Sequence, residues 1–108
     1  MSVGKVYPLS VSKVERKGQS RDDLDTIIRW LTGHTQAELD RKVADGVTFE
    51  EFFASATLNP NADQITGVIC GVRVEAIDDP LIQKVRYLDK LFDELAQGRS
   101  MGMILLAG

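Results

Sequence analysis

The chain has 108 residues, of which 44% are hydrophobic and 27% are charged, and its 13 Lys and Arg are outnumbered by 16 Asp and Glu. This length fits a single domain over residues 1–108, because two domains would each be too small for their own core. The net charge of −3 provides no overall positive field, so neither nucleic acid nor an anionic membrane is an expected partner.

Cysteine content and hydropathy indicate the cellular compartment. Cys70 is the single cysteine, so an intramolecular disulfide is impossible and the class of disulfide-stabilised secreted proteins is excluded. No stretch approaches the roughly 18 apolar residues of a membrane span, and the first residues lack the apolar core of a signal peptide. We therefore expect a cytoplasmic protein without a membrane segment.

Two helices are predicted in the first third of the chain. Pro8 favours the first position of a short helix that ends at Gly18, since the fixed φ of proline suits a helix start. Ser20 is the predicted N-cap of a second helix, which ends at Gly33 and has acidic residues in its first turn. The second helix is amphipathic, with apolar residues at helical spacing: Leu24, Ile27, Ile28 and Leu31.

Two capping boxes, which begin at Thr35 and Thr48, predict two further short helices separated by Gly46. The second of these helices places its phenylalanines on one face, so it should contribute to the core. Together the two helices have the layout of a helix-turn-helix. The would-be recognition helix, FEEFFASA, has no Arg, Lys, Asn or Gln to read bases, so DNA binding is not expected.

The segment Gly67–Ile77 fits two structural templates. With a period of 3.6 its apolar residues form one stripe of a helix that Asn61 would cap. With a period of two, alternate residues share a face as in a strand, and most of them are β-branched: Val68, Cys70, Val72 and Val74.

We predict a helix for this segment, because a strand needs a partner and no other part of the chain alternates. Gly67 and Gly71 would then lie on one side of the helix and allow a neighbouring helix to approach closely. A short strand around Val68–Val74, and with it an α+β fold, is the alternative.

The strongest helix signal comes last. Asp79 is the predicted N-cap, Pro80 occupies the first turn and Gly98 ends the helix. Ile82 and Leu91 widen its apolar arc beyond the main seam of Leu81, Val85, Leu88, Phe92 and Leu95. The predicted fold is therefore all-α, a compact bundle of five to six short helices that ends in a long amphipathic helix.

An apolar C-terminal tail follows over residues 99–108. A free end of this kind is an exposed patch that usually marks an interface, so we expect a homodimer formed through the last helix and the tail. Docking of the tail on its own core is the alternative. The apolar residues of the tail are Met101, Met103, Ile104, Leu105 and Leu106.

Two stretches carry a resemblance to a known family. The sequence DLDTIIRWLTGHTQAEL, with GVICGVRVEAIDDPLIQKVRYLDKLFDELAQG, resembles the small bacterial proteins known as domain of unknown function 2200, over roughly residues 6–104. The resemblance implies a bacterial protein and supplies no activity and no catalytic residue.

Candidate catalytic residues are few. His34 lies in the turn after a helix, where a capping or solvated role is expected, and Cys70 lies among apolar residues, where burial raises the pKa of a thiol and makes it unreactive. One Cys and one His cannot form a zinc site, the acidic clusters lack EF-hand spacing, and no glycine-rich phosphate loop occurs. We expect no catalytic residue, no metal and no cofactor.

One polar set remains, and it is the candidate ligand-binding site: Arg73, Glu75, Arg86, Tyr87 and Asp89. If the last two predicted helices pack antiparallel, these residues converge in a pocket that can hold a small anion, whereas interhelical ion pairs are the simpler interpretation. The leading functional hypothesis is a non-enzymatic protein-interaction or self-association module. The alternative is a small-molecule binding protein or an enzyme that uses the Arg73/Arg86 region.

Overall fold

The computed structural model describes residues 2–69 and 71–105 of the chain. The fold is mainly α, as the sequence predicts, with a small antiparallel hairpin. The elements are α1 (Val3–Arg16), α2 (Arg21–Thr32), α3 (Gln36–Asp45), α4 (Phe49–Ala54), the 3₁₀ helix η1 (Pro60–Gln64), β1 (Val68–Ile69), β2 (Val72–Arg73), the 3₁₀ helix η2 (Val74–Ala76), α5 (Pro80–Ala96) and α6 (Met101–Ile104).

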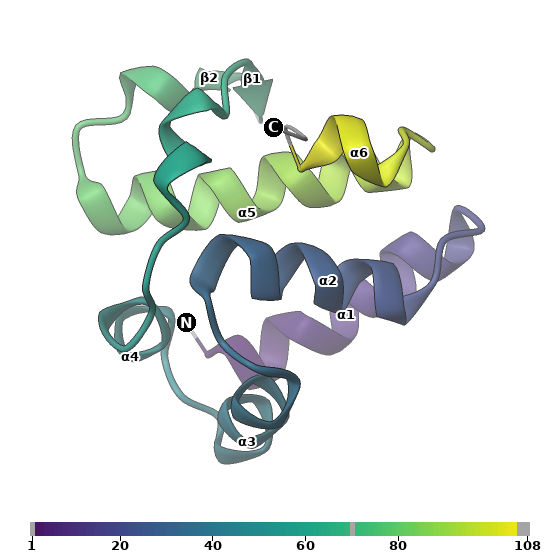
Figure 1. Cartoon of the computed structure of the whole chain (residues 1–108), viewed down its shortest axis with the longest axis vertical. Helices are drawn as coiled ribbons and strands as arrows, with labels where there is room; N and C mark the ends of the chain where they lie inside the picture. The colour runs from purple at the N-terminus through teal and green to yellow at the C-terminus, as the bar shows by residue number, and fades with distance from the viewer. Residues whose placement is uncertain (1, 70, 106–108) are drawn as a thin grey trace.

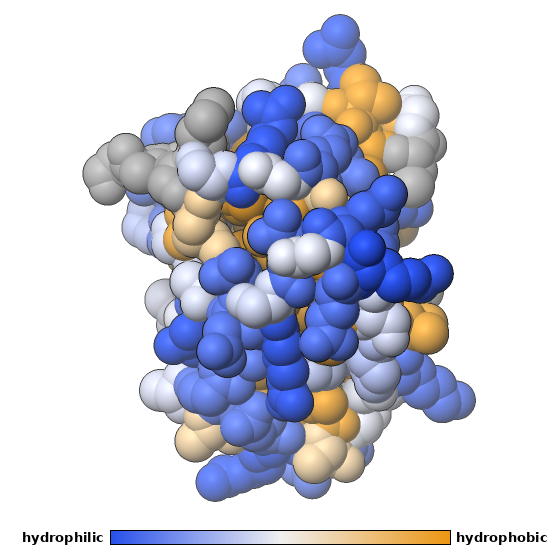
Figure 2. All heavy atoms as spheres, turned by 90° about the vertical axis from the view of Figure 1, so that its right-hand side faces the viewer, coloured by the Kyte–Doolittle hydropathy of each residue, from blue (hydrophilic) through white to orange (hydrophobic). Residues whose placement is uncertain are grey.

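Helix α5 lies at the centre of the arrangement (Figure 1). It packs against α2 on one side and carries the β1–β2 hairpin, η2 and α6 on the other, while α1 and α4 also contact it. Within the described residues no helix is long and apolar enough to cross a membrane. The face shown in Figure 2 is mostly hydrophilic, and apolar side chains reach it only in small separate patches.

Helix α1 begins earlier than predicted. It starts at Val3, so Pro8 lies inside the helix and not at its first position. An interior proline removes a backbone hydrogen bond and costs about 3 kcal/mol in an isolated helix, so tertiary contacts must hold α1. They do so at its first turn, where Val3 N donates to Val47 O at 2.8 Å and a Cβ on Gly4 would lie 2.6 Å from Val43 O.

The predicted caps of α2, α3 and α4 are confirmed. Ser20 accepts from the backbone N–H of Asp23, Thr35 forms the full capping box with Glu38, and Gly33 ends α2 with a left-handed φ of 71°. Thr48 caps α4. These ends hold in place the buried apolar faces that the spacing predicts, which include Leu24, Ile27, Ile28, Leu31, Phe49, Phe52 and Phe53.

The helix predicted for Gly67–Ile77 is wrong. Val68 pairs with Arg73 and Ile69 with Val72 in the β1–β2 hairpin. The alternative of a short strand in this region is closer to the structure, although each strand has only two residues.

The two glycines explain the error. Gly67 has φ 116° and Gly71 has φ 79°, a region that other residues rarely adopt and that no helix uses. The predicted packing role also fails at Gly71, where a Cβ would meet nothing within 4 Å. The predicted cap shifts as well, because Asn59, not Asn61, caps the 3₁₀ helix that stands there.

The last helix agrees with the prediction at its start and its end. Asp79 accepts from the backbone N–H groups of Leu81 and Ile82 at 2.9 and 3.1 Å, and α5 ends at Ala96, shortly before Gly98. The first residues of the apolar tail form α6, which folds back onto α5 and buries Ile104 completely. The described part of the tail is therefore docked on its own chain.

Candidate functional site

The five residues of the predicted site separate into two pairs and one core residue. Arg73 Nη1 lies 3.5 Å from Glu75 Oε1, and Arg86 Nη1 lies 3.2 Å from Asp89 Oδ2. Tyr87 is buried in the core. Among the described residues no hydrogen bond or ion pair is seen between one pair and the other, and of the five only Arg86 and Asp89 line the hollow at the start of α5.

The Arg73–Glu75 pair fastens the hairpin. Glu75 Oε2 accepts from the backbone N–H of Gly67 at 3.1 Å, while the Arg73 side chain is 71% exposed. Hydrogen bonds from its own backbone N–H and from Gly67, together with the Arg73 guanidinium, lower the pKa of Glu75. These contacts tie the two ends of the hairpin together, which is a structural role.

The Arg86–Asp89 pair is the part of the predicted site that faces a hollow. Both side chains line a groove of about 470 Å³ between the starts of α1, α4 and α5. Burial raises the pKa of Asp89, and the charges of Arg86 and Lys13 oppose that shift. The Asp89 carboxylate has thus lost part of its hydration, and the nearby positive charges replace only part of that stabilisation.

The rest of the groove is mainly apolar. Ile82 is 51% exposed and is one of the few large apolar side chains on the surface. The remaining lining residues are Val6, Thr48, Phe49, Glu50, Leu81 and Val85. The sequence pattern predicted Leu81 and Val85 only as part of the core seam of the last helix. Val6 and Phe49 line the groove because α1 and α4 pack beside α5, and no local sequence pattern predicts that packing.

A second, smaller hollow of about 230 Å³ adjoins the groove. It is lined by Ser10 and Lys13 of α1 and by Ile69, Asp89 and Phe92. Asp89 lies in the wall of both hollows, so they follow the seam between α1 and α5 as neighbours. Apolar side chains line the first, and a hydroxyl, an ammonium and a carboxylate line much of the second.

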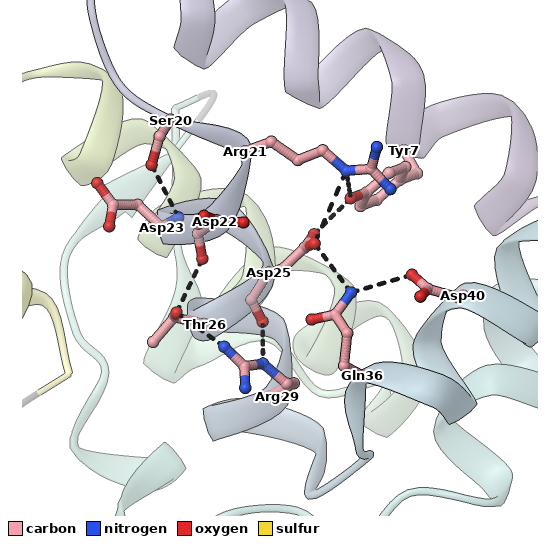
Figure 3. Close-up of polar contacts among 10 residues, drawn as sticks. All are labelled: Tyr7, Ser20, Arg21, Asp22, Asp23, Asp25, Thr26, Arg29, Gln36 and Asp40. Carbon is pink, nitrogen blue, oxygen red and sulfur yellow. Dashed lines mark hydrogen bonds and ion pairs between the residues drawn. The ribbon is translucent and has the colours of Figure 1, made fainter.

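A polar cluster around the buried carboxylate of Asp25 joins α1, α2 and α3 (Figure 3). At its centre is Asp25, which is only 3% exposed. The Tyr7 hydroxyl donates to Asp25 Oδ1, Gln36 Nε2 donates to Asp25 Oδ2 at 3.0 Å, and Arg21 Nε donates to Tyr7 Oη at 2.9 Å. Gln36 Nε2 also donates to Asp40 Oδ1 at 3.0 Å.

The chemistry of this cluster is that of a structural joint. Burial, together with the hydrogen bond to Asp25, raises the pKa of Tyr7 to about 12, which makes its hydroxyl a weaker acid than an ordinary tyrosine. Asp25 differs from the acids Asp22 and Asp23 in the first turn of α2 because it lies on the same buried helical stripe as Ile28 and Thr32.

His34 is buried, which corrects the expectation of a solvated side chain. Its Nε2 lies 3.2 Å from the carbonyl oxygen of Phe52, so this nitrogen carries the proton and donates. The ring also packs against the Phe52 ring at 4.9 Å between centroids, and Nδ1 lies 3.9 Å from a Glu38 carboxylate oxygen. His34 therefore joins α4 to the turn before α3.

The predicted inert thiol of Cys70 lies outside the described residues. Among the residues that the structure describes, no group of three or more His, Cys, Asp or Glu side chains is placed to hold a metal ion. The outer side of α4 carries the exposed acids Glu50 and Glu51.

The fold and the groove define a small, mainly helical bundle protein with an open apolar hollow beside its longest helix. No curated protein matches the chain. The chain is 41% identical to the uncharacterized protein SP1917, whose crystal structure it matches with a TM-score of 0.92, over 98% of this chain and 88% of the other. The chain belongs to the family of uncharacterized proteins conserved in bacteria, DUF2200, whose model matches residues 1–106.

Proposed function

We propose that the protein is a non-enzymatic interaction module that takes up an apolar side chain of a protein partner in the groove at the start of α5. The observation that carries this proposal is the half-exposed Ile82 at the edge of a hollow with apolar walls. An apolar centre with charged groups at its margin, here Glu50 and Arg86, is the usual composition of a protein interface.

Two features of the titratable groups support a non-enzymatic role. His34 is buried against Phe52 and Tyr7 is buried against Asp25 with a pKa raised to about 12, and neither side chain lines the groove. A cytoplasmic location is part of the proposal and rests on the single cysteine of the chain.

Uptake of a neutral, environment-sensitive dye such as Nile red tests the groove directly. We expect the dye to gain fluorescence with the wild-type protein at about 1 µM and to lose most of that gain with Ile82→Glu. Leu9→Glu is the matched control, because Leu9 is also exposed on a helix but does not line the groove. Equal fluorescence from wild type and Ile82→Glu would contradict the proposal.

A small amphipathic anion is the second candidate occupant, because the Arg86 guanidinium lies in the groove wall and the volume falls within the range of ligand pockets. Thermal unfolding with decanoate and with decanol separates the two candidates. A carboxylate-specific ligand at about 100 times its Kd adds about 2.7 kcal/mol of stability, and Arg86→Gln should remove the preference for decanoate over decanol.

A further inference from the structure

Only part of the apolar arc of the last helix is exposed and could contact another chain. The wide apolar arc of α5 is covered at Leu91 and Leu95 by the protein's own core. At the start of α5, Ile82 remains half exposed and no described element covers it. Within the described surface of α5, the start of the helix around Ile82 is therefore the part that a second copy can reach.

The shape of this surface is complementary to itself. Ile82 projects at the edge of the hollow, and the walls of the hollow are formed by Val6, Phe49, Leu81 and Val85. In a two-fold arrangement each copy presents both the projecting side chain and the hollow that receives it. A rotation axis at Ile82 places the two isoleucines side by side, each against the edge of the other copy's groove.

The charges around Ile82 follow the same symmetry. Arg86 lies as far after Ile82 in the sequence as Asp78 lies before it. When two copies of α5 cross antiparallel at Ile82, Arg86 of one copy comes toward the start of the other copy's helix, where Asp78 lies just before the N-cap Asp79. Asp78 is exposed and has no ion-pair partner among the described residues, and the Arg86 side chain, although paired with Asp89, is 36% exposed.

We propose that the partner of the groove is a second copy of this chain, docked antiparallel through the first half of α5 with a two-fold axis at Ile82. This inference rests on the proposed function, because it names the occupant of the same groove. The contact uses parts of three helices only, so it belongs at the small end of interface sizes and should dissociate in the micromolar range.

Sedimentation equilibrium on the full chain tests the dimer. From about 1 µM to about 500 µM the wild type should pass from monomer to dimer. Ile82→Glu should weaken the dimer by at least about 30-fold, because two carboxylates would meet at the axis, whereas Leu9→Glu should leave it unchanged. A monomeric wild type, or equal weakening by both variants, would overturn the inference.

The register has its own test. In an Asp89→Asn background, where Arg86→Glu does not set two carboxylates side by side on α5, Asp78→Arg alone should weaken the dimer about 5-fold. Adding Arg86→Glu should bring the dissociation constant back to within about twofold of that background. Failure of the double variant to recover would overturn the antiparallel register.

Cross-linking provides a test that does not depend on a charged variant folding. With Cys70→Ser, the variant Ile82→Cys should form a disulfide-linked dimer on mild oxidation, since a residue on the axis meets its own copy within disulfide reach. Leu9→Cys in the same background should not. No dimer from Ile82→Cys would overturn the axis position.

The dye experiment separates the two proposals. A wild type that stays monomeric but takes up Nile red in the groove would overturn the second copy as partner and leave the proposed function standing. If a dimer forms but Nile red uptake at about 1 µM is the same for wild type and Ile82→Glu, this groove is the site of neither proposal, and both are contradicted. If the inference holds, rising protein concentration expels the dye.

Discussion

Asp25 and Asp89 are two carboxylates in one small protein, placed in opposite ways. Asp25 lies sealed between three helices and accepts hydrogen bonds from both Tyr7 and Gln36. Asp89 lies in the wall of two hollows and is bound by Arg86. The enclosed carboxylate joins three helices through its hydrogen bonds, whereas the carboxylate beside open space has one charged partner on its own helix and an approachable side.

The largest effect should come from Asp25→Ala. The substitution leaves Tyr7 and Gln36 without their common acceptor and Arg21 without its ion-pair partner, so we expect a loss of about 3–5 kcal/mol in the free energy of unfolding. Urea denaturation measures it. Asp45→Ala is the control, since Asp45 is exposed at the end of α3, and it should change stability by no more than about 0.5 kcal/mol.

Tyr7→Phe should cost less, about 1–3 kcal/mol, because it removes one donor from Asp25 and leaves Gln36 in place. It should also change the alkaline limit of stability. Because the pKa of Tyr7 is raised from 10.0 to about 12 in the folded state, its contribution is complete below pH 10 and is lost as the pH rises through 12.

Urea denaturation between neutral pH and about pH 12 checks this sign. The difference between wild type and Tyr7→Phe should shrink as the pH rises. A difference that stays constant across that range would show that the hydroxyl is not held in its protonated form.

Gln36→Ala should cost about 1 kcal/mol, since it removes the donor shared by Asp25 and Asp40 but leaves the tyrosine hydrogen bond intact. Thermal unfolding detects this change. A loss as large as that of Asp25→Ala would mean that the amide, and not the carboxylate, is the centre of the cluster.

Asp89→Asn should have the smallest effect, within about 0.5 kcal/mol at neutral pH and under conditions where the chain is monomeric. The raised pKa of Asp89 means that the folded state binds this proton more tightly than the unfolded state, so the contribution of Asp89 to stability is highest at acid pH and falls as the pH rises through the folded pKa. Asparagine resembles the protonated form. Urea denaturation of both chains at neutral pH measures the difference, and a loss of several kcal/mol would make Asp89 a structural group like Asp25.

The sequence predicted the elements whose signals are local. Ser20, Thr35, Thr48 and Asp79 each cap a helix where the pattern places them, since a cap depends on residues close in sequence. The segment around Gly67 and Gly71 was mispredicted because its apolar spacing fits a helix, whereas backbone conformation decides the outcome. Both glycines adopt positive φ, and the spacing of apolar residues carries no information about backbone φ.

The candidate site was predicted in part. Arg86 and Asp89 are neighbours on one helix face, so their pairing follows from spacing alone. Arg73 and Glu75 were expected beside them on a second helix, and they lie in the hairpin and the turn that follows it. Val6 and Phe49 enter the groove from elements distant in sequence, which only the packing of α1 and α4 on α5 determines.

The polar cluster around Asp25 can form early, while the chain is still being synthesised. All of its residues lie in the first 40 of the 108 positions, so the joint between α1, α2 and α3 can close while the ribosome is still translating the second half. Helix α5 follows on the order of several seconds later at ordinary elongation rates. Until then, the apolar side chains of α1 and α2 that later pack on α5 remain exposed. Because the early contacts already hold α1, α2 and α3 together, they limit the apolar area that is exposed during this interval.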